Sequence, residues 1–143
     1  MSPFPHHYVV SLLDGALTAP PRAPIAVGPP PQFGGTDRVW SPEELFVGAI
    51  LECLWTTFEA YARRDKLVVR KWSGSGLAIL DRVERVPSFT SIELMVRIEV
   101  DAGNEDRGRT LLAKAEDNCI ISHALRVPVK VTAIVDAHED IAA

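Results

Sequence analysis

Apolar side chains surround a predicted helix nearly completely between residues 41 and 64. Ser41 is a residue type that caps helices, Pro42 suits the first helical position, and Glu43 and Glu44 favour the positive end of the helix dipole. A helix on the surface of a domain has a single apolar stripe. This central helix therefore needs cover on several sides, and in a chain of 143 residues a second copy is an economical source of that cover.

The segments before this helix predict short strands and a loop. Residues 6–13 are rich in β-forming residues and end at Asp14-Gly15, a strong turn signal, so a strand and a short return strand are expected. Residues 19–35 contain six prolines and three glycines, which exclude a helix and supply few amides to a sheet. We expect a loop there, with one short strand near residues 25–27.

Two long β-like segments follow the helix and predict a hairpin within residues 67–100. Gly74-Ser75-Gly76 is expected to mark a bulge or bend in the first segment, and Pro87 to break the chain between the two. Apolar residues alternate most regularly from Ile92 to Val100, as in a half-buried strand.

A helix over residues 104–117, a short helix over 119–125 and a strand over 129–135 complete the predicted order, and the tail from His138 is expected to fray. This order favours an α+β fold with antiparallel strands in a single domain. Its predicted parts are an N-terminal hairpin with a proline-rich loop at residues 1–40, a central helix at 41–64, a β-hairpin at 67–100, two helices at 104–125 and a final strand at 128–136.

Composition excludes several classes of partner. The formal net charge of −4 and the pI of about 5.5 argue against nucleic acid and anionic membranes, which select clustered Lys and Arg. The longest apolar segment, Leu45 to Leu54, contains Glu52 and is too short to span a bilayer. No secretory signal is visible at the N-terminus. We therefore expect a cytoplasmic protein that binds neither nucleic acid nor membrane.

The chain has two cysteines, Cys53 and Cys119, which are 66 residues apart and fit no metal-binding motif, so neither a metal nor a cofactor is expected. From their number alone, both could be buried thiols that act as small hydrophobes. Cys53 lies in the middle of the central helix, where a reactive thiolate needs a cation from outside that helix. Cys119 falls at the first position of the short helix if Asn118 caps it, and His123 follows one turn later as a possible partner of the sulfur or an ordinary surface residue.

Two thiols of different character suit a peroxidase in which one sulfur attacks the O–O bond and the other resolves the sulfenic acid as a disulfide. The surrounding residues add a resemblance. Two stretches are similar to the osmotically inducible protein C and organic hydroperoxide resistance (OsmC/Ohr) family. The first is Pro31-Gln32-Phe33-Gly34-Gly35 with Ser41-Pro42-Glu43-Glu44-Leu45-Phe46 and then Cys53, and the second runs from Ala115-Glu116-Asp117-Asn118-Cys119 through Ile120-Ile121-Ser122 to Ala124-Leu125. The resemblance covers about residues 29 to 135.

The resemblance implies an OsmC-like fold in which two chains interlock as a homodimer, with antiparallel sheets wrapped around the long central helices. It implies that Cys53 is the peroxidatic cysteine, that Cys119 is the resolving one, and that organic hydroperoxides are reduced without metal or haem at the expense of dithiols or lipoyl groups. Glu43 matches the catalytic carboxylate of the family. Ten helical residues place Glu43 about 15 Å from Cys53 of its own chain, so the carboxylate is expected to reach the cysteine of the other chain in an intersubunit site.

One departure concerns the family's arginine near the first hairpin, where this chain has Leu12 or Leu13. Arg22 and Arg38 are the nearest alternatives, and Arg38 is the favoured one because it precedes Glu43 by five residues and an arginine pairs bidentately with a carboxylate. A second departure is Ile120, where the family often has proline.

The leading hypothesis is thus thiol-dependent reduction of organic hydroperoxides by Cys53 and Cys119, with Glu43 and Arg38 as supporting catalytic residues. Phe33, Phe46 and Trp55 are the predicted apolar wall of the substrate pocket. The alternative is an OsmC-like protein that binds a small apolar ligand and lacks efficient peroxidase activity, and the missing hairpin arginine motivates it.

Overall fold

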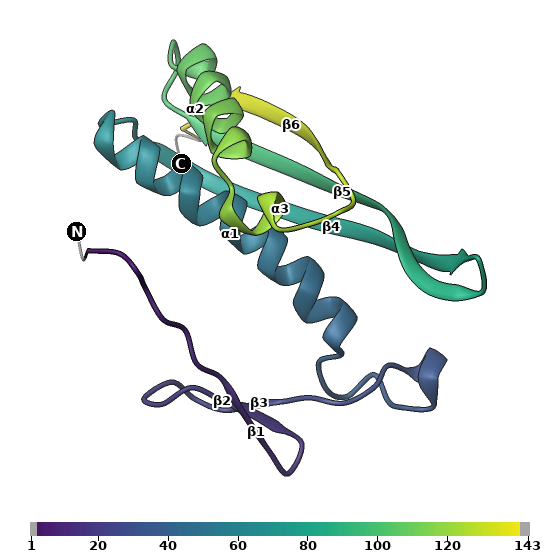
Figure 1. The fold of residues 1–143 in the computed structure, drawn as a ribbon. Coiled ribbons are helices and arrows are strands. Elements are labelled where there is room, and N and C mark those ends of the chain that lie inside the picture. Colours follow the sequence, from purple (N-terminus) through teal and green to yellow (C-terminus); the bar gives the residue numbers. More distant parts are fainter. Residues whose placement is uncertain (1–2, 141–143) are drawn as a thin grey trace. The chain divides into compact units, whose positions relative to one another are not determined.

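The computed structural model describes residues 3–140, and its contacts divide the chain into two compact units, Met1–Phe46 and Val47–Ala143. The first unit contains a small antiparallel sheet of β1 (Ser11–Leu13), β2 (Ala16–Thr18) and β3 (Ile25–Ala26), followed by the short 3-10 helix η1 (Pro31–Phe33) (Figure 1). The predicted hairpin and third strand are confirmed, although β1 is shorter than expected. The prediction of a single domain stays a prediction.

Helix α1 (Pro42–Arg64) begins where its capping signals predict. The Ser41 hydroxyl oxygen accepts a hydrogen bond from the Glu44 amide at 3.1 Å, which satisfies one of the free donors of the first turn. Ser41 is only 1% exposed, so the cap itself is buried.

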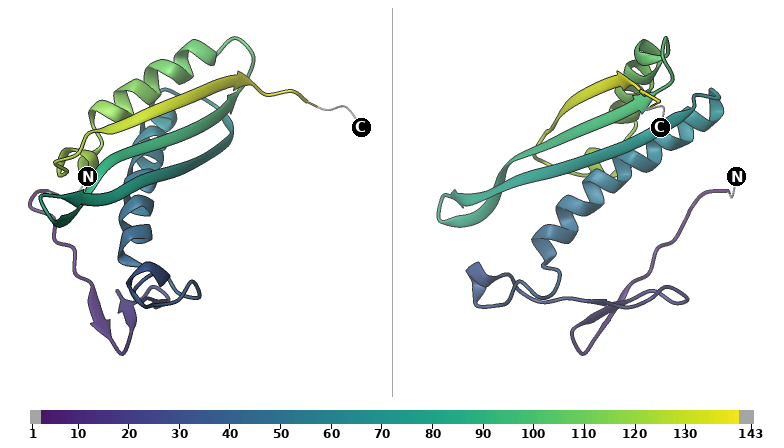
Figure 2. Two further views of the ribbon diagram at one scale, coloured as in Figure 1. Left: turned by 90° about the vertical axis from the view of Figure 1, so that its right-hand side faces the viewer. Right: turned by 180° about the vertical axis from the view of Figure 1, so that it is seen from behind.

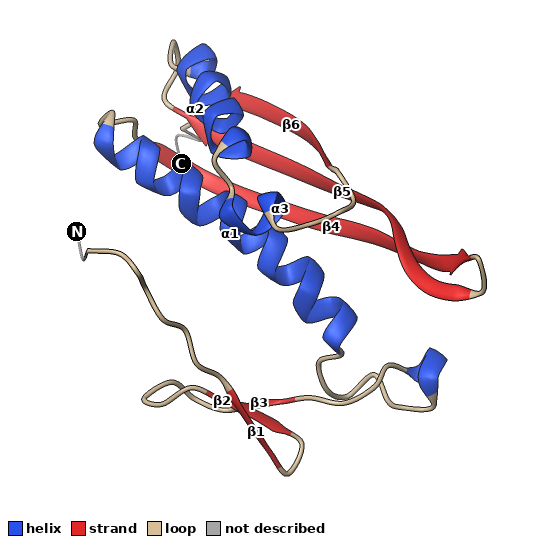
Figure 3. Ribbon diagram, viewed as in Figure 1, coloured by secondary structure: helices blue, strands red, loops and turns tan. Residues whose placement is uncertain are grey.

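The second unit is built on a sheet with the strand order β4 (Val69–Val83), β5 (Val86–Val100) and β6 (Val129–Ala137) (Figure 3). Strands β4 and β5 form the predicted antiparallel hairpin. The prediction that all strands are antiparallel is wrong for β6, which runs parallel to β5. The reason is the crossover through α2 (Glu105–Asp117) and α3 (Ile120–His123), which returns the chain to the same end of the sheet.

Helices α1 and α2 pack on the same face of this sheet (Figure 2), which is the face that carries the buried side chains of β5. A Cβ on Gly76 would lie 2.6 Å from a Val47 methyl of α1, and one on Gly108 would lie 2.9 Å from a Val135 methyl of β6. Glycines at these positions therefore let the helices approach the strands closely. The buried β5 residues are Ile92, Leu94, Val96, Ile98 and Val100.

The β4–β5 hairpin differs from its prediction in two details. Gly74, Ser75 and Gly76 lie in regular pairing, so the predicted bulge there is wrong; the irregularities fall between Val69 and Lys71 and between Ile79 and Leu80. Pro87 does not break the chain, because it lies just inside β5 next to the turn, where β5 has already begun at Val86.

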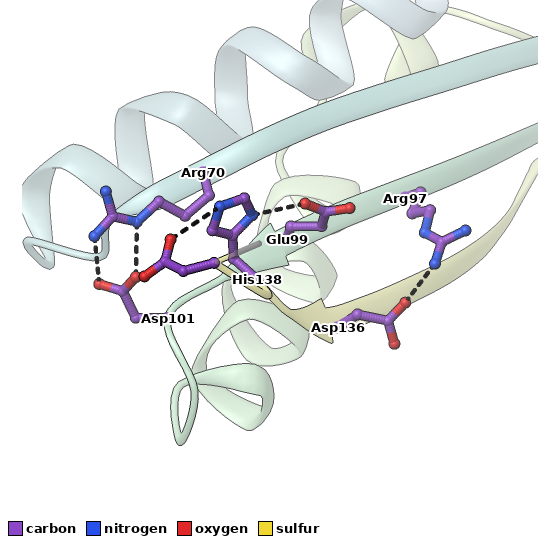
Figure 4. Close-up of polar contacts among 7 residues, drawn as sticks. Arg70, Arg97, Glu99, Asp101, Asp136 and His138 are labelled. Atoms are coloured by element: carbon purple, nitrogen blue, oxygen red, sulfur yellow. Dashed lines mark hydrogen bonds and ion pairs between the residues drawn. The ribbon is translucent and has the colours of Figure 1, made fainter. Parts of the chain in front are cut away.

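A polar cluster lies at the end of the sheet where β4 begins and where β5 and β6 finish (Figure 4). Arg70 of β4 pairs with Asp101 at 2.7 Å, and the His138 ring lies 2.9 Å from Glu99 of β5. The His138 amide also donates to the Val100 carbonyl at 2.7 Å. The prediction that the chain frays from His138 onward is therefore wrong for His138 itself, while residues 141–143 lie outside the described part of the chain.

Helix α1 is incompletely covered within a single chain. Ile50, Leu54, Phe58 and Ala62 are buried, but Trp55 is 41% exposed. By length and composition alone, this helix is apolar enough to cross a membrane, but the central helices of soluble proteins pass the same test. Of its most apolar 18 residues, 22% are buried. The expectation of no membrane, which rested on a shorter segment, stays a prediction.

Candidate functional site

Helix α1 presents Cys53, Thr57 and Tyr61 on one ridge, because residues four apart share a helix face. The ridge faces the α2–α3 segment. Cys53 contacts Cys119 and the backbone of Ile121, and Lys114 of α2 lies 4.6 Å from the centre of the Tyr61 ring. The sequence thus places the first thiol where the crossover between β5 and β6 passes over the central helix.

Cys119 itself is the N-cap of α3, with φ −71° and ψ 109°. The prediction that Asn118 caps this helix and that Cys119 occupies its first position is wrong, because Asn118 instead ends α2. The Cys119 sulfur accepts a hydrogen bond from the Ser122 hydroxyl at 3.3 Å. His123 contacts Cys119 through its backbone amide, which donates to the Cys119 carbonyl at 3.1 Å, and its side chain is exposed.

The two sulfurs meet. Cys53 and Cys119 are both free thiols, and they lie close enough that the Cys119 side chain raises the pKa of Cys53. Cys119 is 1% exposed and Cys53 is half-buried, so Cys53 is the more accessible of the two. The chemistry that such a pair can perform is reversible oxidation to a disulfide.

The pKa of the Cys53 thiol is raised, first by burial, which disfavours the thiolate. The Ile121 amide opposes this by donating to the sulfur, the hydrogen bond and the charge of Cys119 raise the pKa further, and a Thr57 hydroxyl hydrogen bond lowers it. None of these groups is a cation. Within residues 3–140, the cation that a reactive Cys53 requires is therefore not among the groups that act on this thiol.

Glu43 and Arg38 belong to the first unit. Within residues 3–140, the Oε2 atom of Glu43 is buried without a hydrogen-bond partner, and no ion pair joins Glu43 to Arg38. Arg38 is exposed, and its amide donates to the Thr36 hydroxyl at 3.2 Å. A buried carboxylate oxygen without a donor is costly, so Glu43 is in a place where a positive partner would be stabilising. The roles predicted for both residues stay predictions.

The three predicted apolar pocket residues belong to both units. Phe33 in η1 is 54% exposed and Phe46 is half-buried, both in the first unit. Trp55 is off the Cys53 ridge, because two helical residues turn by about 200°. It lies against Trp72 of β4, with ring centres 6.5 Å apart, and lines a shallow pocket of about 220 Å³ together with Thr56, Glu59, Ala60 and Arg63. Substrate binding by these residues stays a prediction.

Three residues of the site were missed by sequence reasoning: Thr57, Ile121 and Ser122. Thr57 could have been predicted, since it is four residues after Cys53 in the predicted central helix. Ser122 lies three residues after Cys119, and this spacing points to a contact with the sulfur only if Cys119 is known to cap α3. Within residues 3–140, no group of three His, Cys, Asp or Glu side chains is arranged to hold a metal ion.

The α+β fold and the two facing thiols define a small dithiol protein. The chain belongs to the OsmC-like protein family, whose sequence model matches residues 35–133, so the resemblance read from the sequence is confirmed. Comparison with curated proteins finds no match.

Solved structures share the fold. An OsmC-like protein of unknown function from Vibrio cholerae is 18% identical with a TM-score of 0.75, and 83% of this chain and 82% of that chain are covered. The organic hydroperoxide resistance protein OsmC from Legionella pneumophila is 20% identical with a TM-score of 0.67, and 92% of this chain and 99% of that chain are covered. An organic hydroperoxide resistance protein from Elizabethkingia anophelis is 17% identical with a TM-score of 0.70, and 93% of this chain and 99% of that chain are covered. At these identities the likeness establishes the fold.

Proposed function

We propose that this protein reduces organic hydroperoxides through a dithiol–disulfide cycle of Cys53 and Cys119. The observation that carries the proposal is the closeness of the two thiols, which are distant in sequence but interact strongly enough that Cys119 raises the pKa of Cys53. Membership of the OsmC-like family supports it, as do the names of the Legionella and Elizabethkingia proteins that share the fold.

The cycle has three steps. The Cys53 thiolate attacks a peroxide oxygen, so that an S–O bond forms, the O–O bond breaks, and the leaving alkoxide takes a proton to become an alcohol. The Cys119 thiolate then attacks the sulfenic sulfur, so that an S–S bond forms and hydroxide leaves as water. An external dithiol, which a lipoyl group can supply, reduces the disulfide and is itself oxidised to a disulfide.

A second copy of the chain completes the site in this proposal. The incompletely covered α1 supports a homodimer, and so do exposed apolar residues on the β4–β5 hairpin, such as Leu77 and Val86. The unpartnered Glu43 oxygen supports an intersubunit arrangement in which Glu43 and a cation, with Arg38 as the favoured candidate, reach the Cys53 thiol of the other chain. Such a cation would counter the burial that raises the pKa of Cys53.

The deciding experiment is consumption of cumene hydroperoxide with a dithiol reductant by the wild type and by Cys53→Ser. Loss of the nucleophile is expected to lower the rate at least about 100-fold. Equal slow rates in both proteins would reject the peroxidase.

The second candidate function is binding of a small apolar ligand without efficient peroxidase activity. The observation in its favour is that burial raises the pKa of Cys53 while, in the described part of the chain, no cation is among the groups acting on it. Equal slow rates in the assay above, together with saturable binding of an apolar fluorescent probe, are the results expected of it.

A further inference from the structure

Ser122 contacts the second sulfur from within the same short helix. Its hydroxyl donates to the Cys119 sulfur at 3.3 Å. Cys119 caps α3 in an extended conformation, and Ser122 is the third residue of that helix, so the hydroxyl reaches back by one turn onto the capping side chain. Cys119 is 1% exposed, so water has little access to replace this donor.

The same short segment also holds the first sulfur. Hydrogen bonding from the Ile121 backbone lowers the pKa of the Cys53 thiol, on which the side chain of Cys119 also acts. Residues 119–122 therefore supply the second thiol, a backbone donor for the first thiol, and a hydroxyl donor for the second. A hydrogen bond from Ser122 restricts rotation of the Cys119 side chain, and so keeps its sulfur directed toward Cys53.

We propose that Ser122 is a positioning residue for disulfide formation by Cys119. The proposal deepens the peroxidase function proposed above and rests on it for its biological role. When Cys119 attacks the Cys53 sulfenic acid, the S–S bond forms, the S–O bond breaks, and hydroxide takes a proton to leave as water. The Ser122 hydroxyl stabilises the attacking Cys119 thiolate and fixes its direction, and it takes no part in the attack of Cys53 on the peroxide.

The test separates the two steps in Ser122→Ala, with Ser122→Thr as the variant that keeps a hydroxyl. After one equivalent of cumene hydroperoxide, Cys53 sulfenic acid is trapped with dimedone, and the disulfide is followed by mass spectrometry after rapid quenching. Sulfenic acid formation is expected to be unchanged within about twofold, and disulfide formation to slow about tenfold, the size expected for loss of one hydrogen bond to a charged group. Ser122→Thr is expected to restore the rate, which a loss of packing alone does not explain.

A second measurement does not depend on peroxide. An aromatic disulfide reagent first forms a mixed disulfide on the more accessible Cys53, and Cys119 then displaces the second aromatic thiol by closing the Cys53–Cys119 bond. This second release is expected to slow in Ser122→Ala and to recover in Ser122→Thr. His123→Ala is the matched control from the same helix and is expected to keep the wild-type rate.

Equal second-release rates in wild type, Ser122→Ala and Ser122→Thr would overturn the role of Ser122, whatever the peroxidase assay gives. A wild type that forms no sulfenic acid with peroxide yet closes the disulfide in a Ser122-dependent manner would reject the peroxidase function and leave the positioning role supported.

Discussion

The Cys53 thiol of α1 and the Cys119 thiol at the start of α3 are 66 residues apart in sequence but lie together in the fold, where Cys119 raises the pKa of Cys53. The contact exists because the crossover between parallel strands β5 and β6 carries α2 and α3 over the ridge of α1 that holds Cys53. A disulfide between them would link the central helix to this crossover.

The first prediction concerns the resolving thiol. Cys119→Ser is expected to complete one reaction with peroxide and then to stop, because the Cys53 sulfenic acid has no thiol with which to condense. Mass spectrometry should find Cys53 sulfenic acid, and at higher peroxide the sulfinic acid, where the wild type has a disulfide. Sustained wild-type turnover in Cys119→Ser would show that another thiol resolves Cys53.

The second prediction concerns pH. Because the pKa of Cys53 is raised, its thiolate fraction and its alkylation rate should increase with pH beyond the range of an ordinary thiol. Thr57→Val removes a donor that lowers this pKa, so its profile should shift to higher pH. Cys119→Ser removes a group that raises the pKa, so its profile should shift to lower pH. Thr57→Ser, which keeps the hydroxyl, is the control, and identical profiles for Thr57→Val and wild type would contradict the contact.

The third prediction concerns the helix–sheet contact at Gly76. A Cβ there would lie 2.6 Å from a Val47 methyl and 3.1 Å from a Leu94 methyl, so Gly76→Ala must shift the Val47 side chain or the α1 backbone that carries it. The free energy of unfolding is expected to fall by about 1–3 kcal/mol in urea denaturation, as for other overpacked sites. Ser75→Ala, on the adjacent exposed position of β4, is expected to change it by less than about 0.5 kcal/mol. Equal stability of both variants would mean that the contact is easily relaxed.

The fourth prediction concerns acid stability. The His138 hydrogen bond lowers the pKa of Glu99, and the Arg70 guanidinium lowers the pKa of Asp101. Groups with a lowered folded-state pKa stabilise the fold fully above their unfolded pKa values of about 4, and the contribution is lost as the pH falls through the folded-state values. Thermal melts from pH 7 to pH 3 should therefore show less acid destabilisation in Glu99→Gln and Asp101→Asn than in wild type.

The control for these melts is Asp106→Asn, which removes the partner of Arg109 in an exposed pair on α2. It is expected to follow the wild-type pH dependence closely, since such pairs contribute little. The same acid slope in all four proteins would show that the cluster does not couple protonation to folding.

The fifth prediction concerns the homodimer. The wild type is expected to elute as a dimer in gel filtration, and Ala60→Glu, on the exposed face of α1, is expected to raise the dimer dissociation constant at least about 100-fold because it buries an unpaired charge. Ala113→Glu, on the exposed face of α2, is the matched control and should remain dimeric. A stable wild-type monomer at micromolar concentration would reject the second copy as the cover of α1.

The predictions from sequence succeeded where the signal is local. The Ser41 cap, the Asp14-Gly15 turn and the alternation from Ile92 to Val100 each depend on neighbouring residues, and each is found in the structure. They failed where the partner is distant. Gly74 and Gly76 were expected to bend a strand, but their function is to admit the side chains of Leu51 and Val47 from α1.

The sequence by itself determined the central helix, the long hairpin, the two cysteines and the family, because capping, periodicity and motif spacing are written in consecutive residues. Only the tertiary structure decided that β6 runs parallel to β5, that Cys119 caps α3, and that its sulfur meets Cys53 beside Ser122. These facts depend on the path of the α2–α3 crossover, along which α2 packs closely against the sheet at Gly108.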